Sequence, residues 1–152
     1  MVAIDTDVLL LAFAFQNDKR QAANTAFLQR VQTAEPATTV CNLIEILGQM
    51  SFNLSPVHLD AWQSWLIEAY QLTVIWPVEM DRMSALSFRA EIFDQPFARM
   101  RAHRMSFMDA LVLNLSERTP GVESFVTWNA RHFKSKSSLT VLTPEEYLRQ
   151  SA

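Results

Sequence analysis

The sequence predicts a three-layer α/β/α domain whose central sheet is mainly parallel. Short apolar or β-branched runs with the character of strands alternate along the chain with longer segments of helical spacing. Such alternation favours a parallel sheet, because each helix returns the chain to the edge from which the next strand starts. The length of 152 residues, with no linker or internal repeat, fits a single domain over residues 1–152. The predicted strands are 2–4, 38–40, 72–76, 125–127 and 140–142.

Helix-start signals place several of the predicted helices. Ser55 is an N-cap residue with Pro56 at the first helical position, and together they open a helix to about residue 70. Residues 143–146, Thr-Pro-Glu-Glu, form a capping box that opens a short final helix. The segment 94–104 is polar and basic, and its structure is left unassigned. The other predicted helices are 8–15, 18–32, 42–52, 79–92 and 106–118.

Composition excludes several classes of site and protein. Two glycines are too few for a phosphate-cradling loop, and the single cysteine, Cys41, excludes an intramolecular disulfide and a zinc–thiolate site. We therefore expect a cytoplasmic protein. Asp5 and Asp7 precede the apolar run 8–15, where a signal peptide carries positive charge, and no stretch is long enough to span a bilayer. The formal net charge of −3 argues against a charge-driven duplex binder.

Oxygen-bearing side chains occur where the predicted strands end. Asp5 follows the first strand, Glu45 lies in the first turns of the helix after the second strand, and Asp109 lies in the first turn of the helix that begins at about residue 106. Asn129 follows the fourth strand. Because the carboxyl ends of parallel strands meet at one edge of the sheet, we expect these groups to converge. Clustered carboxylates repel one another unless a cation such as Mg²⁺ or Mn²⁺ neutralises them.

Four segments carry a family resemblance. Residues 4–10, IDTDVLL, resemble the opening D-[TS]-[NSD]-V-L-L motif of PIN domains, and residues 42–47, NLIEIL, are similar to the second motif with its glutamate. Residues 105–113, MSFMDALVL, resemble the L-S-x-x-D-A-L helix start, and residues 127–133, TWNARHF, resemble the late T-x-[DN]-x-x-x-F pattern. The four segments occur in the family's order and extend over the whole chain.

The resemblance implies a PIN fold, binding of Mg²⁺ or Mn²⁺, and endonucleolytic cleavage of RNA. It makes Asp5, Glu45 and Asp109 metal ligands and, with Asn129, the catalytic residues. Asn129 departs from the most acidic version of the pattern, so a second ion should bind more weakly. For a single-domain chain the resemblance further implies a VapC-like toxin of a VapBC toxin–antitoxin pair, with a cognate antitoxin as partner, and we expect a homodimer.

Neighbouring residues are expected to support this site. Thr6 and Thr127 can hydrogen-bond the carboxylates or a bound water, and we expect Asp7 to cap the first helix. Two basic segments flank the acids and fit either RNA phosphates or a solvated surface. The first segment holds Arg99, Arg101, His103 and Arg104, the second holds Arg131, His132, Lys134 and Lys136, and the RNA-contact candidates are Arg101, Arg104 and Arg131.

An apolar stripe on the predicted helix 56–70 indicates core packing. Trp62 and Trp65 cannot both point inward easily, so a dimer face is the second interpretation of this stripe. The remaining members of the stripe are Leu59, Leu66 and Ala69.

Each site residue also has a purely local interpretation. Asp5 at a strand end can be a helix N-cap, Ser106-x-x-Asp109 can be a capping box, and Asn129 can hold a turn. Glu45 lies opposite the apolar face of its helix, where an acid is normally solvated. Only the joint occurrence of the four residues favours a shared acidic site.

Two other functions remain open. Asp5-Thr6-Asp7 resembles the D-x-D opening of haloacid-dehalogenase-type phosphatases, in which the first aspartate is a nucleophile and the second a general acid. That family needs a paired-acid motif on another strand end, and Asn129 stands there instead. The other alternative is a PIN-like module that binds RNA or protein with little cleavage, which Asn129 and the acidic pI allow.

Overall fold

The centre of the molecule is a five-stranded sheet. The computed structural model describes residues 1–77 and 84–150. All four strand pairs are parallel, and the strand order is β3-β2-β1-β4-β5. Ala3 of the central strand lies opposite Ala37 on one side and Phe125 on the other. The strands are β1 Val2–Ile4, β2 Pro36–Thr39, β3 Thr73–Ile75, β4 Ser124–Val126 and β5 Thr140–Leu142.

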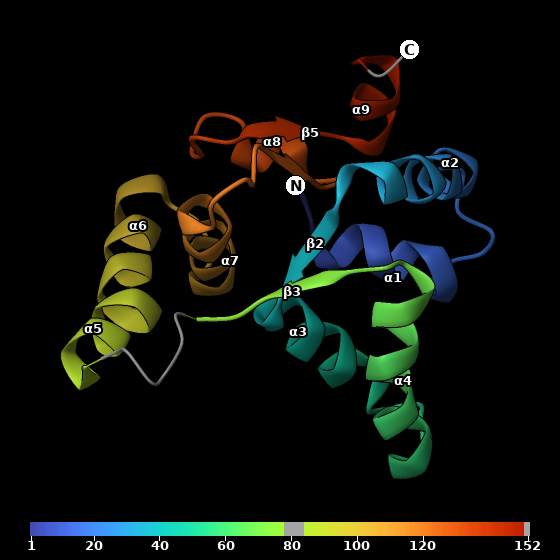
Figure 1. The fold of residues 1–152 in the computed structure, drawn as a ribbon, viewed down its shortest axis with the longest axis horizontal. Helices are drawn as coiled ribbons and strands as arrows, with labels where there is room; N and C mark the ends of the chain where they lie inside the picture. The colour runs from blue at the N-terminus through green and yellow to red at the C-terminus, as the bar shows by residue number, and fades with distance from the viewer. Residues whose placement is uncertain (78–83, 151–152) are drawn as a thin grey trace.

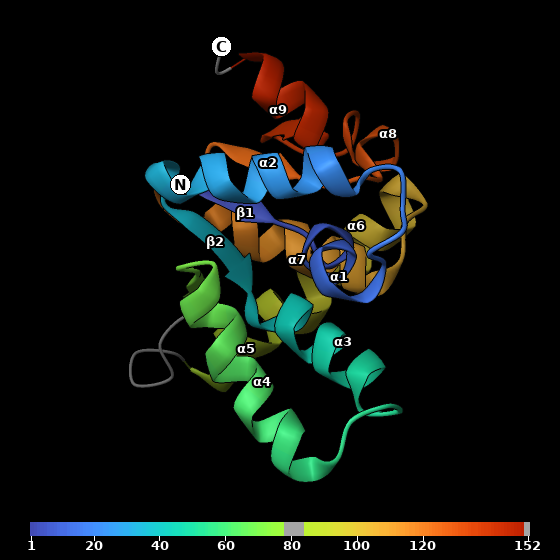
Figure 2. The ribbon, with the colours of Figure 1, turned by 90° about the vertical axis from the view of Figure 1, so that its right-hand side faces the viewer.

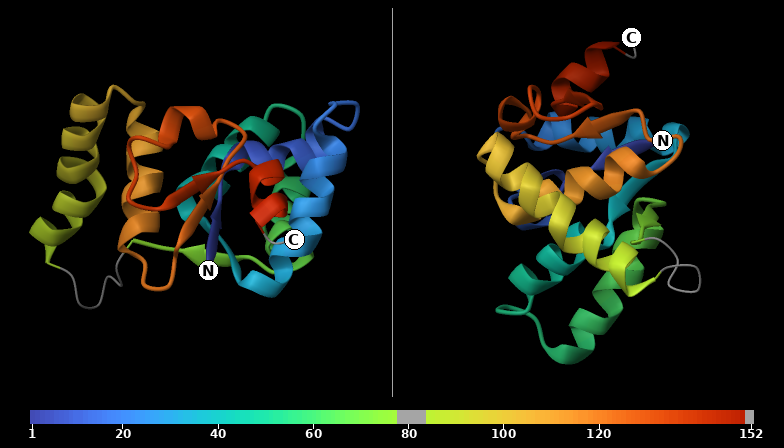
Figure 3. Two further views of the ribbon diagram at one scale, coloured as in Figure 1. Left: turned by 90° about the horizontal axis from the view of Figure 1, so that it is seen from above. Right: turned by 90° about the vertical axis from the view of Figure 1, so that its left-hand side faces the viewer.

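Alternate strand residues feed two separate cores. Ala3 and Phe125 pack in the core that contains α7 (Phe107–Arg118) and α8 (Ala130–Phe133). Ile4 and Val126 pack in the other core, with the helices α1 Thr6–Ala14, α2 Gln21–Val31 and α9 Pro144–Gln150. Adjacent strand residues face opposite sides of a sheet, so one helical layer covers each face (Figures 1 and 3). The predicted three-layer α/β/α architecture is confirmed.

Two helices form an arm that extends beyond the sheet. Helices α3 (Val40–Met50) and α4 (Pro56–Ala69) pack against each other at one end of the molecule (Figure 2). Trp62 of α4 contacts Phe13 of α1, with ring centroids 4.3 Å apart, whereas Trp65 is 48% exposed. The two tryptophan rings contact each other, with centroids 4.9 Å apart, so Trp65 covers the outer side of Trp62, and a dimer face at Trp65 stays a prediction.

The segment between β3 and α7 departs most from the prediction. Residues 94–104, left unassigned, contain the helix α6 Gln95–His103, which follows α5 (Ala85–Arg89) and the π-helical turn η3 (Ala90–Asp94). The first residues of the predicted helix 79–92 lie outside the described residues. Helix α6 has a single buried residue, Pro96, and its sequence therefore lacks the apolar stripe that would have indicated a helix. A short 3₁₀ turn, η1 Gln32–Ala34, ends the segment predicted as helix 18–32.

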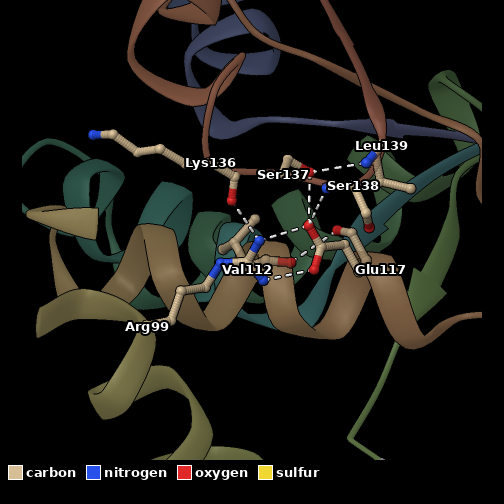
Figure 4. Close-up of polar contacts among 8 residues, drawn as sticks. Arg99, Val112, Glu117, Lys136, Ser137, Ser138 and Leu139 are labelled. Carbon is tan, nitrogen blue, oxygen red and sulfur yellow. Dashed lines mark hydrogen bonds and ion pairs between the residues drawn. The ribbon is translucent and has the colours of Figure 1, made fainter. Parts of the chain in front are cut away.

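A partly buried ion pair connects α6, α7 and the loop before β5 (Figure 4). The Arg99 guanidinium donates to both carboxylate oxygens of Glu117, at 2.7 and 2.6 Å, and to the carbonyl oxygen of Lys136 at 2.6 Å. Glu117 also accepts from the Ser137 hydroxyl at 2.7 Å and the Ser138 amide at 2.9 Å. Arg99 is therefore a structural residue, which corrects its placement among the basic residues for RNA phosphates.

We predict that Glu117→Gln lowers the free energy of unfolding by about 1–3 kcal/mol, measured by urea denaturation at neutral pH. The amide keeps the size of the side chain but leaves the Arg99 guanidinium, 15% exposed, without an opposing charge. Burial alone raises the pKa of Glu117, but the hydrogen bonds from Arg99, Ser137 and Ser138 outweigh it and lower the pKa below the usual glutamate value of 4.5.

This contribution is therefore complete above the unfolded-state pKa and is lost as the pH falls through the lower folded-state value. The control is Glu123→Gln, because Glu123 has an exposed side chain. Equal stability of the two variants at neutral pH would contradict the structural role of Glu117.

Candidate functional site

A polar pocket of about 190 Å³ lies where the carboxyl ends of β1 and β4 meet the first turns of α1 and α7. Every residue predicted to carry the chemistry contributes to its wall. The side chains come from positions up to 124 residues apart, and the parallel strand order brings them to one edge. The lining residues are Asp5, Thr6, Asp7, Leu10, Glu45, Gln49, Asp109, Asn129 and Phe133.

Asp5 is the most strongly perturbed acid of the pocket. It is the N-cap of α1, its carboxylate accepts from the Thr6 amide at 2.8 Å, and Asn42 donates to it from Nδ2 at 3.1 Å. Burial raises its pKa to about 7, and the negative charges of Asp7 and Asp109 add to the effect. Asp5 therefore caps α1, as its local interpretation predicts, and also lines the pocket with the other acids.

Asp7 corrects one prediction. We expected it to cap the first helix, but Asp5 occupies that position. The Asp7 carboxylate instead accepts hydrogen bonds from the loop after β4: from the Thr127 hydroxyl at 3.1 Å, the Trp128 amide at 3.2 Å and the Asn129 amide at 3.1 Å. Burial raises the pKa of Asp7, and these donors oppose the rise. Asp7 thus fixes the loop that carries Asn129 beside the pocket.

Glu45 joins the pocket through a hydrogen-bonded chain. The Thr6 hydroxyl donates to the Glu45 carboxylate at 2.7 Å, and Asn42 Nδ2 donates to the Thr6 hydroxyl oxygen at 3.0 Å. Asn42 is also the third residue of α3 and forms a reciprocal capping box with Thr39. The expected supporting role of Thr6 is present in this geometry. Asn42 was missed, although Thr39-x-x-Asn42 at the start of the helix is a capping pattern that marks it.

Asp109 has one local and one distant partner. Its amide donates to the Ser106 hydroxyl at 3.0 Å, as the capping interpretation predicts. Its carboxylate oxygen lies 3.4 Å from Nε2 of His132, and Nδ1 of His132 lies 3.4 Å from Nζ of Lys136. The sequence places His132 and Lys136 in the second basic segment and predicts no contact between His132 and Asp109. No local pattern could reveal this pairing, because 23 positions separate the two residues.

The donor set and the charge of the pocket fit a hard divalent cation. All the polar lining side chains offer oxygen, and the charges of Asp7 and Asp109 add to the effect of burial in raising the pKa of Asp5. As the side chains stand, however, no three acidic, histidine or cysteine residues within 1–77 and 84–150 form a group that could hold a metal ion. Glu45 is turned toward Thr6 and Asp109 toward His132, so an ion would need to draw both from these partners.

The expected RNA-contact residues lie outside the pocket wall. Arg101 and Arg104 are exposed on and just after α6, and Arg131 is exposed on α8, two residues after Asn129. Arg104 ends α6 in the left-handed conformation, with φ 50°, and turns the chain toward α7. No helix in the described part of the chain is both long and apolar enough to cross a membrane.

Comparisons with known proteins bear on the fold. No protein-family model matches the chain, and no curated protein matches it in sequence. Among solved structures, a chain in the crystal structure of VapBC2 from Rickettsia felis bound to a DNA fragment from their promoter has a TM-score of 0.65 and 14% identity. The match covers 94% of this chain and 98% of that one. With the five-stranded parallel sheet, this likeness confirms the predicted PIN-like α/β fold.

We predict that Asp5→Asn stabilises the metal-free protein at pH values above 7. The folded-state pKa of Asp5, about 7, exceeds the ordinary value of 3.8, so ionisation of Asp5 destabilises the fold increasingly as the pH rises between these values. Asparagine keeps an oxygen for the Thr6 and Asn42 donors without the charge. The melting temperature in chelator should rise by at least about 2–4 °C, the shift that 1 kcal/mol produces in a domain of this size.

The matched control is Asp60→Asn, an exposed position on α4 whose melting temperature should not change. Below the unfolded-state pKa the advantage of Asp5→Asn should vanish. A variant that melts at or below the parent temperature at alkaline pH would contradict the electrostatic account of Asp5.

Proposed function

We propose that the chain is an endoribonuclease that depends on Mg²⁺ or Mn²⁺ and hydrolyses RNA phosphodiester bonds. One observation carries the proposal: Asp5, Asp7, Glu45, Asp109 and Asn129 line a single pocket, where burial, together with the charges of Asp7 and Asp109, raises the pKa of Asp5 to about 7. Such a concentration of carboxylates destabilises a fold unless it serves to bind a cation. The PIN-like fold and the four sequence motifs support the same activity.

In this proposal Asp5, Glu45 and Asp109 hold the ion, and Asn129 offers a neutral oxygen beside them. A bound Mg²⁺ or Mn²⁺ supplies neutralisation of the charge that develops on the phosphate and lowers the pKa of a water. The chain contributes the geometry: the Thr6 amide and Asn42 hold the Asp5 carboxylate, and the Thr6 hydroxyl, 2.7 Å from the Glu45 carboxylate, keeps Glu45 at the pocket until an ion draws it in. Glu45 can then accept a proton from the attacking water.

The hydrogen bonds of Asp7 favour the nuclease over a phosphatase. In a D-x-D phosphatase the second aspartate must be free to give a proton to the leaving group. Both carboxylate oxygens of Asp7 accept hydrogen bonds from the loop after β4, from the Thr127 hydroxyl and two backbone amides, so the carboxyl is not free to reach a leaving group. Among the described residues that line the pocket there is also no lysine. The alternative of a weakly catalytic binding module is supported mainly by Asn129, because the most acidic version of the fourth motif has an aspartate at this position.

We further propose that the chain is the toxin of a type II toxin–antitoxin pair. The similar solved chain belongs to a complex named VapBC2, so a partner protein is part of that assembly. An open acidic pocket at the surface offers a site for a basic side chain of an antitoxin, which would replace the cation and block the pocket. A homodimer stays an expectation of this proposal.

We predict that Asp5→Asn and Asp109→Asn each reduce cleavage of an unstructured RNA by at least about a hundredfold in Mn²⁺, because each removes a ligand charge from the ion. Cleavage is measured on a labelled oligonucleotide in Mn²⁺ and in chelator, with Asp60→Asn as the exposed control. Circular dichroism melts show that each variant is folded.

Three results would count against the nuclease. The proposal fails if the parent protein leaves RNA intact in Mn²⁺, or if Asp5→Asn cleaves at the parent rate. Turnover of an aryl phosphate that is lost in Asp7→Asn would instead favour the phosphatase. RNA binding without cleavage would favour the binding module.

The antitoxin proposal predicts a short reading frame next to this one, whose product binds the chain. Co-expressed with the tagged chain, that product should co-purify with it and reduce RNA cleavage by more than about tenfold. Asp5→Asn should weaken the complex, because it removes charge from the pocket that the antitoxin covers. A product that co-purifies equally with both forms and leaves cleavage unchanged would refute the blocking role.

A further inference from the structure

Two stacked phenylalanine rings lie exposed along η3 and α6. The rings of Phe93 and Phe97 have centroids 5.6 Å apart and an interplanar angle of 7°, and the side chains are 50% and 39% exposed. Phe107, at the start of α7, extends the row, with its centroid 5.9 Å from that of Phe93. We call Phe93, Phe97 and Phe107, together with Arg101, the outer aromatic face.

The charge of this face is positive. The guanidinium of Arg101 lies over the Phe97 ring, 5.8 Å from its centroid. Helix α6 contains no acidic residue, and the nearest one, Asp94, forms an ion pair with Arg89. Arg99 is committed to Glu117, so Arg101 and Arg104 are the arginines that α6 and its C-cap expose to solvent.

The outer aromatic face and the acidic pocket share the helix α7. Figures 1 and 3 place α6 at the outer edge of the molecule, with α7 on its inner side. Phe107 and Asp109 both belong to the first turn of α7, two residues apart, so the row of rings and the pocket both reach the start of this helix.

We propose that the outer aromatic face binds unpaired bases of single-stranded RNA, which stack on Phe97 and Phe93 while Arg101 contacts the phosphates. A base is planar and stacks on an aromatic side chain or an arginine plane, whereas a base in a duplex is covered on both faces. Exposed rings beside the guanidinium of Arg101 complement this ligand in shape and charge. The inference rests on the proposed function for its ligand, but its test does not require cleavage.

The experiment measures binding of a short oligoadenylate with one 2-aminopurine, in chelator so that the RNA stays intact. Fluorescence anisotropy gives the dissociation constant, and quenching of 2-aminopurine reports stacking on a ring. Phe97→Leu and Phe93→Leu, which keep an apolar side chain, should each weaken binding about tenfold and relieve the quenching. Phe97→Tyr should stay within about twofold of the parent, because it keeps the ring.

The matched control is Trp65→Leu, which removes a similarly exposed aromatic ring, 48% exposed, from α4. It should leave both signals unchanged. If both leucine variants bind and quench as the parent does, the inference is overturned. It is also overturned if the parent sediments as a dimer and these variants sediment as monomers, because the face would then join two copies of the chain.

The test separates this inference from the nuclease proposal. If the parent binds and quenches in a Phe97-dependent manner but never cleaves in Mn²⁺, the base-binding face stands and the nuclease falls. If the parent cleaves in Mn²⁺ and the leucine variants bind as the parent does, the nuclease stands and the base-binding face is refuted.

Discussion

The constraint on which the site depends is the electrostatic cost of crowding carboxylates at one edge of a parallel sheet. Three aspartates and a glutamate line one pocket of about 190 Å³, and burial with two neighbouring negative charges raises the pKa of Asp5 to about 7. Strongly shifted pKa values of this kind cluster at functional sites, where the loss of stability is offset by selection for function. The hydrogen bonds around the pocket therefore hold the acids in place against their mutual repulsion.

Much of the fold could be predicted because its signals are local. The five strands are short apolar runs, and Ser55, Ser106 and Thr143 occupy N-cap positions that a single sequence displays. Helix α6 could not be predicted, since it contributes little to the core and shows no hydrophobic period. The gathering of Asp5, Glu45, Asp109 and Asn129 followed from topology, because strand ends share an edge.

The partners within the site could not be read from the sequence, because they depend on long-range side-chain geometry. Asp7 stands next to a helix start, so a capping role was the natural expectation, yet its carboxylate bonds to a loop 120 residues further along. Arg99 looked like a free cation, but its partner Glu117 lies on another helix. The pairing of Asp109 with His132 likewise connects elements whose packing no local pattern encodes.

In the proposed nuclease, the separation of charges across the molecule accounts for how a chain of net charge −3 would meet RNA. A phosphate cannot approach a bare acidic pocket, so cationic groups must lie beside it and not within it. Arg101, Arg104 and Arg131 are exposed on elements that flank the pocket, and none of them lines it. In this proposal the acids that bind the cation and the arginines that contact the flanking phosphates occupy different surfaces, and the formal net charge averages over both.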